Sequence, residues 1–135
     1  MKEINGFLEK VRKWAAPQSN IKVILLVGSY ARGQAHDESD IDLVMLTDEP
    51  EKYLQDPSFA GTFGSIDRIE KEYWGRVTSF RIWYQDGFEV ELGITTPDWI
   101  FDDPLDAGTL RTITGGAEVV TDKTGKVERI IASVR

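Results

Sequence analysis

The chain has 135 residues and a formal net charge of −7, and this length fits one compact domain. Its acidic surplus argues against sequence-independent binding of long nucleic acid, which needs clustered Lys and Arg. The absence of cysteine excludes disulfides, thiolate catalysis and cysteine-based zinc sites. No apolar stretch approaches the roughly 20 residues of a membrane helix, and the first residues carry charges in place of an apolar leader, so we expect a cytoplasmic protein that binds no membrane.

Hydrophobic periodicity predicts one helix and two strands in the first third of the chain. Apolar residues recur at helical spacing over residues 4–14, and Pro17 is expected to end that helix. Residues 21–27 are nearly all apolar, which is typical of a strand that is buried on both faces, and residues 41–46 predict a second strand. Between the strands lies a turn with a glycine at each end, residues 28–33 (GSYARG).

The rest of the chain predicts a further helix, a hairpin and a closing α/β segment. Asp48 is expected to cap a helix, and residues 56–66 to form an irregular surface loop. Residues 76–84 and 88–95 form a predicted hairpin with Gly87 in the left-handed conformation. Three elements follow: a short helix over 105–113, a strand over 117–121, and a helix or extension over 127–134. Together these elements predict an α/β (α+β) fold in which helices flank a mixed β-sheet.

The turn GSYARG has features of a phosphate-binding loop. Gly28 would let the backbone approach an anion closely, and the residues after it would direct backbone N–H groups towards that anion. Ser29 adds a hydroxyl donor, and Arg32 adds a guanidinium that can bind phosphate. A P-loop is excluded because Gln34 and Ala35 replace its Lys and Ser/Thr. Taken alone, the turn is equally compatible with a strand-to-helix connection that only needs glycine.

Two pairs of acidic residues lie on predicted strands. Asp40 and Asp42 are two positions apart, so their side chains point to the same side and repel each other. Glu89 and Glu91 repeat this spacing on a later strand. Mg²⁺ prefers such oxygen ligands, and a third acid from a neighbouring strand would complete a two-metal site. Solvated strand ends are the alternative explanation.

Taken together, these motifs resemble a known family. Gly28-Ser29, then ten residues, then Asp40-Ile41-Asp42, and later an acid between hydrophobic residues, are similar to the DNA polymerase β-type nucleotidyltransferase superfamily. The stretch LVGSYARGQAHDESDIDLVML resembles its small prokaryotic branch, which includes minimal nucleotidyltransferases and catalytic domains of aminoglycoside-modifying enzymes. The resemblance implies a nucleotidyltransferase fold in a single domain, residues 1–135. It also implies a Mg²⁺-dependent enzyme that transfers an NMP from an NTP to an acceptor hydroxyl and releases pyrophosphate.

The resemblance assigns roles to particular residues. Nucleotide binding falls to four of them: Gly28, Ser29, Arg32 and Ser39. Metal binding and catalysis fall to three carboxylates that would hold two Mg²⁺ ions: Asp40, Asp42 and Glu91. Glu91 is preferred to Glu89 as the third carboxylate because Val90 and Leu92 flank it deeper in the strand.

The resemblance leaves the acceptor open. We expect ATP as the NTP, and a small molecule or a protein as the acceptor. The acceptor site would come from residues 56–84, from a second copy of the chain in a homodimer, or from a partner protein. Two alternatives remain: an antitoxin-type regulatory nucleotidyltransferase that acts on a partner protein, and an inactive nucleotide-binding module.

Several other side chains receive no role from the sequence. A lone loop histidine such as His36 is usually just exposed. Three tryptophans could stack on a base or an aromatic acceptor, although aromatic residues on β-rich segments more often belong to the core: Trp74, Trp83 and Trp99. Arg76 and Arg81 are five positions apart on a predicted strand, so at most one of them faces the carboxylates.

Overall fold

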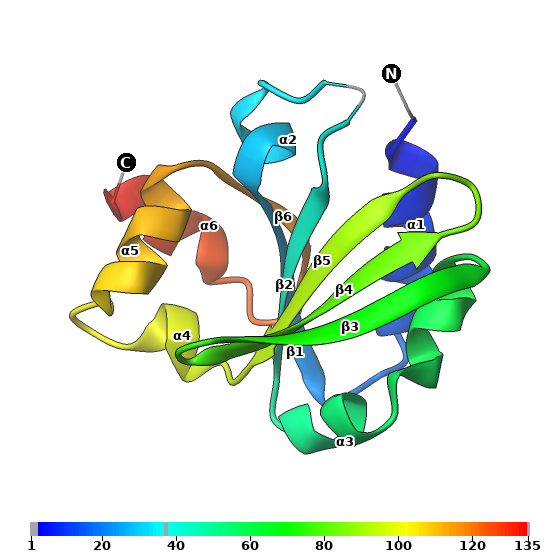
Figure 1. Cartoon of the computed structure of the whole chain (residues 1–135). Coiled ribbons are helices and arrows are strands. Elements are labelled where there is room, and N and C mark those ends of the chain that lie inside the picture. The colour runs from blue at the N-terminus through cyan, green and yellow to red at the C-terminus, as the bar shows by residue number, and fades with distance from the viewer. Residues whose placement is uncertain (1–2, 37, 135) are drawn as a thin grey trace.

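A six-stranded mixed sheet forms the centre of the protein (Figure 1). The structure is a computed structural model and describes residues 3–36 and 38–134. The strand order is β3-β4-β5-β2-β1-β6, in which β2 and β5 are parallel and the other neighbours antiparallel. The strands are β1 (Ile21–Val27), β2 (Ile41–Thr47), β3 (Ile66–Trp74), β4 (Val77–Tyr84), β5 (Glu89–Thr95) and β6 (Ala117–Asp122). The predicted mixed sheet and hairpin are therefore confirmed.

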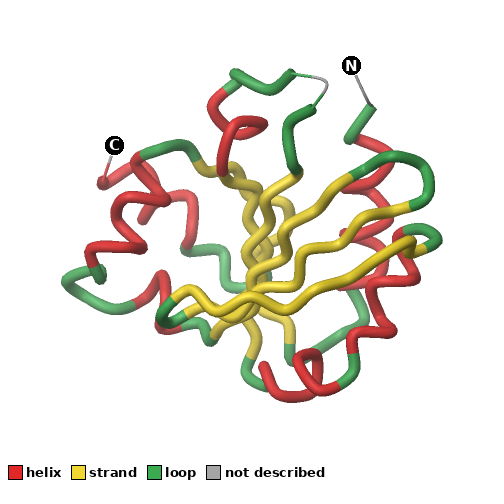
Figure 2. The backbone as a smooth tube through the Cα atoms, in the orientation of Figure 1, coloured by secondary structure: helices red, strands yellow, loops and turns green. Residues whose placement is uncertain are grey.

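Helices lie on both faces of the sheet (Figure 2). They are α1 (Asn5–Ala15), α2 (Gly28–Arg32), α3 (Pro50–Gln55), the 3₁₀ helix η1 (Pro57–Phe63), α4 (Asp98–Phe101), α5 (Ala107–Thr114) and α6 (Val127–Val134). The helices α1, α3 and η1 pack with one face of the sheet, and α4, α5 and α6 pack with the other. None of the helices in the described part of the chain is long and apolar enough to cross a membrane.

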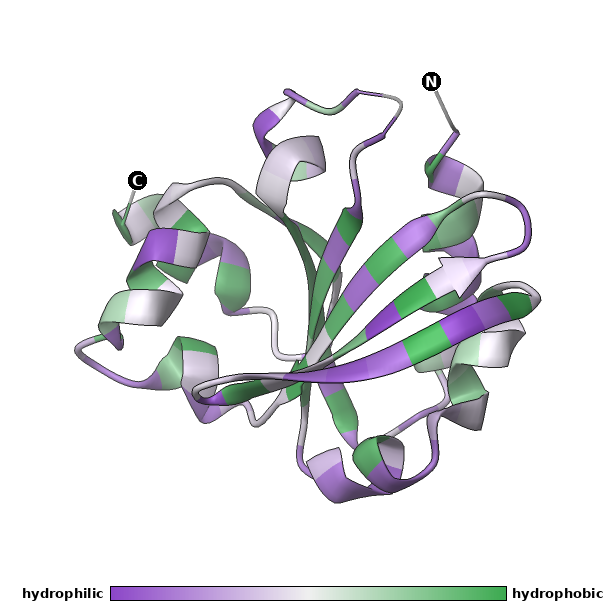
Figure 3. Ribbon diagram, in the orientation of Figure 1, coloured by the Kyte–Doolittle hydropathy of each residue, from purple (hydrophilic) through white to green (hydrophobic). Residues whose placement is uncertain are grey.

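The two hydrophobic clusters explain why β1 and β2 read as nearly continuous apolar runs. Ile24 and Leu26 face the first cluster, while Val23 and Leu25 face the second. A strand with helices on both faces has no solvated side, so its sequence does not alternate. The hairpin strands β4 and β5 do alternate over most of their length: Phe80, Ile82 and Tyr84 of β4 and Val90, Leu92 and Ile94 of β5 belong to the first cluster, and Arg81, Glu89 and Glu91 lie on the opposite face. The edge strand β3 is largely hydrophilic (Figure 3).

The structure corrects several of the predicted elements. The residue at the N-cap of α3 is Glu49 rather than Asp48, whose carboxylate instead pairs with Lys22 at 3.3 Å. The segment 56–66 is not an irregular loop, because it forms η1 and buries Ala60 and Phe63 in the first cluster.

Two further differences from the predicted elements concern the strand β3 and the glycine turn after β1. The strand β3 was missed altogether, because its exposed edge carries mostly charged residues and lacks a clean apolar alternation. The turn after β1 contains the short helix α2, and Gly33 ends it with a φ of +72°. Gly87 adopts the predicted left-handed conformation, with a φ of +97°.

Candidate functional site

The strand register brings the predicted motifs to one place on the sheet. Val27, the last residue of β1, pairs with Asp42 of β2, which in turn lies opposite Glu91 of β5. On the far side of β5, Arg81 of β4 lies opposite Glu91. Three ionisable residues therefore form a row across three neighbouring strands. They point to the same face as the second cluster, where α4, α5 and α6 leave this end of the sheet uncovered.

Gly28 follows β1 directly and makes room for the Asp42 carboxylate. Its φ of +74° lies in the left-handed region, and a Cβ atom placed on it would lie 2.2 Å from Asp42 Oδ2. A side chain at position 28 would therefore collide with the carboxylate. The glycine that the sequence suggested for approach to an anion thus lets the turn pack against the predicted metal ligand.

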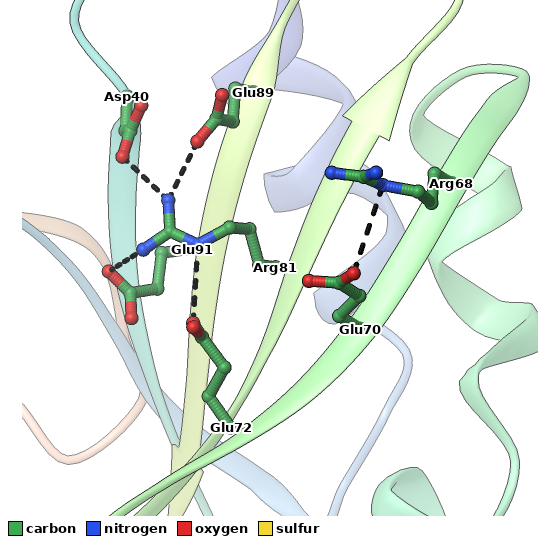
Figure 4. Close-up of polar contacts among 7 residues, drawn as sticks. All are labelled: Asp40, Arg68, Glu70, Glu72, Arg81, Glu89 and Glu91. Carbon is green, nitrogen blue, oxygen red and sulfur yellow. Dashed lines mark hydrogen bonds and ion pairs between the residues drawn. The ribbon is translucent and has the colours of Figure 1, made fainter.

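Arg81 binds four carboxylates at the site (Figure 4). Its Nη1 lies 2.8 Å from Asp40 Oδ2 and 2.7 Å from Glu89 Oε2. Its Nε lies 3.2 Å from Glu72 Oε1, and its Nη2 lies 3.4 Å from Glu91 Oε2. All five side chains are partly buried, with exposed fractions of 21% for the arginine and 24–32% for the acids. The inference that at most one of Arg76 and Arg81 faces the carboxylates is confirmed, because Arg76 pairs with Asp98 and Asp102.

Asp42 is the acid that Arg81 does not bind. Burial, and after it the charges of Glu91 and Asp40, raise the pKa of Asp42 to about 7, against smaller opposing effects of Arg81 and Arg32. Burial also raises the pKa of Glu91, while Arg81 acts in the opposite direction. Two neighbouring acids thus resist ionisation, which is the situation that an additional cation would relieve.

The donor set fits a hard divalent cation in its chemistry. Asp40, Asp42 and Glu91 offer carboxylate oxygens, the ligands that Mg²⁺ prefers. Among the residues that the structure describes, however, no group of three or more His, Asp or Glu is arranged to hold a metal ion. The reason is visible in Figure 4: Asp40 and Glu91 both turn towards Arg81. Metal binding therefore requires these two carboxylates to reorient.

The residues predicted to bind phosphate are more dispersed. Ser29 is half-buried in α2, next to Gly28. The Arg32 guanidinium donates a hydrogen bond to the Gly115 carbonyl oxygen at 3.5 Å. The hydroxyl of Ser39 accepts a hydrogen bond from the backbone N–H of His36 at 2.9 Å and so holds the loop before β2. The structure thus brings Gly28 to the carboxylates, whereas Ser39 has a contact within its own loop.

A cavity of about 430 Å³ adjoins the carboxylates. Its lining includes Asp42 and Val44 of β2, Glu91 and Gly93 of β5, and residues of α5. Thr109 of α5 is fully buried there, and its hydroxyl has no hydrogen-bond partner among the described residues. No local sequence pattern indicates this cavity, because its lining comes from segments that are far apart in the chain.

The three tryptophans occupy different environments. Trp99 is buried in the second cluster with an exposed fraction of 4%. The ring of Trp83 is covered by Arg68, whose guanidinium carbon lies 3.9 Å from the ring centroid. Trp74 lines the cavity and is 57% exposed. Of the three, Trp74 has the exposed ring that stacking on a planar ligand requires.

Sequence reasoning missed Glu72, Thr109 and the role of Arg81. The hairpin turn contained the signal for Arg81. A hairpin centred on Asp86 pairs positions 81 and 91, and this pairing is the one observed. No comparable signal marks Glu72, because it lies on the strand that was not predicted.

Comparisons with known proteins agree with the site. The family profile described as "Nucleotidyltransferase domain" matches residues 4–99. A protein of Methanocaldococcus jannaschii, named "Putative protein adenylyltransferase", is 39% identical over 71 residues, which cover 53% of this chain and 67% of that protein.

Solved structures share the fold at low sequence identity. An aminoglycoside 6-adenyltransferase from Bacillus subtilis superimposes with a TM-score of 0.59 at 14% identity. The match covers 76% of this chain but only 38% of that protein, so it shows the fold alone. A toxin–antitoxin structure with AMP-PNP matches 94% of this chain and 82% of its own, at 15% identity and a TM-score of 0.48. That likeness is too weak to support an inference about partners or ligands.

The sequence resemblance is therefore confirmed for both family and fold. The profile match includes β1, the glycine turn, β2 and β5, and hence Gly28 and the three predicted carboxylates. The chain belongs to the nucleotidyltransferase domain family and is a nucleotidyltransferase.

Proposed function

We propose that this protein transfers an adenylyl group from ATP to a hydroxyl on a protein acceptor, with Mg²⁺ held by Asp40, Asp42 and Glu91. The observation that carries the proposal is the row formed by Asp42 and Glu91 on β2 and β5, with Asp42 packed against the glycine turn. The name of the Methanocaldococcus jannaschii relative supports both adenylyl transfer and a protein acceptor. That residues 1–135 form a single nucleotidyltransferase domain remains part of this proposal.

The residues around the carboxylates divide the tasks of the reaction. When bound, Mg²⁺ would orient the acceptor oxygen and stabilise the charge that develops at phosphorus, and the family resemblance implies two such ions. The backbone at Gly28, with Ser29 and Arg32, would hold the β- and γ-phosphates. Ser39 would act on phosphate only if it left its contact with His36.

The bond changes follow from this placement. The acceptor oxygen forms a bond with the α-phosphorus, and the bond from that phosphorus to the oxygen bridging the β-phosphate breaks, so that pyrophosphate leaves. The hydroxyl proton passes to a carboxylate. Glu91 suits this role because burial raises its pKa. Positioning and electrostatics then supply most of the rate enhancement.

The cavity offers a place for the nucleoside. Its lining includes Asp42 and Glu91, beside which the α-phosphate would lie, and the apolar side chain of Val44. Its only fully buried hydroxyl without a partner in the described residues belongs to Thr109, which could bond a polar edge of the base. Trp74 would cover the entrance.

The end of the β3–β4 hairpin supports a protein acceptor. Tyr73 and Trp74 are 76% and 57% exposed there, and Trp74 also lines the cavity. Large aromatic side chains that are exposed beside a reaction site are typical of a surface that binds another protein.

Calorimetric titration with a non-hydrolysable ATP analogue and Mg²⁺ tests the site. We expect metal-dependent binding to the wild type that is lost in Asp42→Asn. Glu118→Gln is the matched control, because it removes one negative charge from an exposed position on β6, at the opposite edge of the sheet. Retained binding in Asp42→Asn, or none in a folded wild type, would overturn the proposal.

A second measurement separates the enzyme from its two alternatives. ATP labelled at the α-phosphate is incubated with the protein and a lysate, and label on proteins is followed. Transfer that needs Asp42 supports the proposal. A single labelled partner that also copurifies with the chain would favour the antitoxin-type function. Nucleotide binding without transfer to any acceptor would favour the inactive module. Comparison of Glu91→Gln with Glu89→Gln identifies the third carboxylate.

A further inference from the structure

Arg81 has more acidic partners than a structural arginine needs. One carboxylate neutralises a guanidinium, but Arg81 contacts four, at N–O distances from 2.7 to 3.4 Å. Two of these partners, Asp40 and Glu91, belong to the metal-binding set of the proposed function. The other two, Glu72 and Glu89, do not.

The contacts divide into an inner and an outer set (Figure 4). Towards the inner set, Nη2 contacts Glu91 and Nη1 contacts Asp40. Towards the outer set, Nε contacts Glu72 on β3 and Nη1 also contacts Glu89 on β5. If the inner contacts break, the outer ones still give the guanidinium two carboxylate partners. The arginine can therefore release the two inner carboxylates while the two outer ones still neutralise its charge.

A guanidinium and a divalent cation cannot share the same carboxylate oxygens without strong repulsion. Asp40 Oδ2 and Glu91 Oε2, the two inner oxygens, already face Arg81. These contacts with Arg81 agree with the finding that no three His, Asp or Glu residues among residues 3–36 and 38–134 are arranged to hold a metal ion. The guanidinium thus fills the electrostatic role of a metal ion beside the acids.

We propose that Arg81 is the counter-ion of the metal-free site, and that a divalent cation bound by Asp40, Asp42 and Glu91 displaces it onto Glu72 and Glu89. The inference rests on the metal ligands of the proposed function. Its consequence is that Arg81 competes with the metal, so the site has low affinity for the metal alone. The metal ion binds to this site when the triphosphate of the nucleotide supplies additional ligands. Arg81 is thus a positioning residue that ties metal binding to nucleotide binding.

The test compares two arginines on the same face of the sheet. Arg81→Met removes the competing charge, whereas Arg68→Met removes an equal charge from an exposed side chain that stacks on Trp83 and forms an ion pair with Glu70, at 4.0 Å (Figure 4). Mn²⁺ binding is measured by calorimetry without nucleotide and again with the non-hydrolysable ATP analogue. Without nucleotide, we expect Arg81→Met to bind Mn²⁺ at least about tenfold more tightly than the wild type, because a nearby positive charge is gone. We expect Arg68→Met to stay within about twofold of the wild type, because exposed charges are screened.

Thermal unfolding gives a second readout. Metal-free Arg81→Met should melt at a lower temperature than the wild type, since four carboxylates lose their shared counter-ion, and saturating Mn²⁺ should raise its Tm by more than that of the wild type. If Arg81→Met does not fold, Arg81→Lys replaces it. Lysine keeps the charge but cannot bridge four carboxylates with a planar fork, so Mn²⁺ affinity without nucleotide should still rise.

The outcomes separate this inference from the proposed function. Unchanged or weaker Mn²⁺ binding by the Arg81 variants, in a protein whose wild type binds Mn²⁺ with the ATP analogue, would overturn the role of Arg81 and leave the metal site intact. An equal gain in Arg68→Met would attribute the effect to net charge and would also overturn it. Absence of Mn²⁺ binding in all variants, with and without the analogue, would refute the metal site and this inference with it.

Discussion

Gly28 and Gly33 provide a matched pair for testing how the glycine turn supports the site. Both have left-handed backbone conformations, with φ values of +74° and +72°. They differ in their surroundings. A Cβ atom on Gly28 would lie 2.2 Å from Asp42 Oδ2 and 3.1 Å from its Cγ, whereas nothing lies within 4 Å of a Cβ atom on Gly33. Alanine at position 33 therefore has only a backbone cost, and alanine at position 28 has that cost plus a collision.

The two costs can be estimated separately. A left-handed conformation costs a residue with a side chain about 1–2 kcal/mol. Forcing a side chain into an occupied space adds about 1–3 kcal/mol. We therefore expect Gly33→Ala to lower the free energy of unfolding by about 1–2 kcal/mol and Gly28→Ala to lower it by about 2–5 kcal/mol. The corresponding fall in Tm is about 4 °C for each kcal/mol.

Urea unfolding of the metal-free protein measures both costs. The same substitution in an Asp42→Ala background identifies the collision, because it removes the two atoms nearest to the added methyl group and leaves the Asp42 Cβ atom at 3.3 Å. The excess cost of Gly28→Ala over Gly33→Ala should largely disappear in that background. Equal costs for the two single variants, or an excess that persists without the Asp42 carboxylate, would refute the packing of Asp42 against the turn.

Three further substitutions test buried polar groups. Folding raises the pKa of Asp42 from 3.8 to about 7. Below about pH 4 the carboxyl is protonated in both the folded and the unfolded state, so it costs no folding stability. Between about pH 4 and about pH 7 the unfolded state loses this proton more readily than the folded state, so the loss of folding stability grows with pH. Asp42→Asn should thus match the wild type near pH 4 and be more stable by about 1–2 kcal/mol at pH 8 without metal, after allowance for solvent screening; equal urea midpoints at pH 8 would contradict this. Tyr53→Phe removes the hydroxyl that donates to Asn20 Oδ1 at 2.7 Å and should cost about 1–2 kcal/mol in the same assay, so an unchanged midpoint would count against that bond. Thr109→Val should either leave the stability of the ligand-free protein unchanged or raise it by up to about 1 kcal/mol. The same substitution should weaken binding of the ATP analogue about threefold, and unaltered affinity would exclude Thr109 from the nucleoside site.

Most of the fold followed from local patterns. An apolar run without alternation predicted that β1 lies between two layers, and alternation in residues 88–92 predicted a strand with one polar face. The edge strand β3 could not be predicted in this way. It pairs with the sheet along one edge, and its charged side chains, such as Glu72, contact residues of the neighbouring strand β4. The helix η1 was missed for a different reason: its stability comes from burial of Phe63 beside α1, a contact that no local pattern records.

The candidate site was predictable where spacing alone fixes geometry. Residues two apart on a strand share a face, which placed Asp40 with Asp42 and Glu89 with Glu91. The choice between Glu89 and Glu91 depends on register between β2 and β5, since Glu91 and not Glu89 lies opposite Asp42. Parallel register is set by a long connection, here residues 48–88, whose path the sequence did not reveal.

The charges at the site lead to one further conclusion about where a ligand enters. Arg81 contacts Asp40, Glu72, Glu89 and Glu91, but the Asp42 carboxylate has no hydrogen bond or ion pair with another described residue. It is also the acid that packs against Gly28 and lines the cavity. Glu91 also lines the cavity but is already paired with Arg81, so Asp42 is the lining carboxylate that a cation from the cavity meets without an arginine partner. In the proposed site, Asp42 would therefore be the first ligand of the metal, and Asp40 and Glu91 would join it only as Arg81 withdraws.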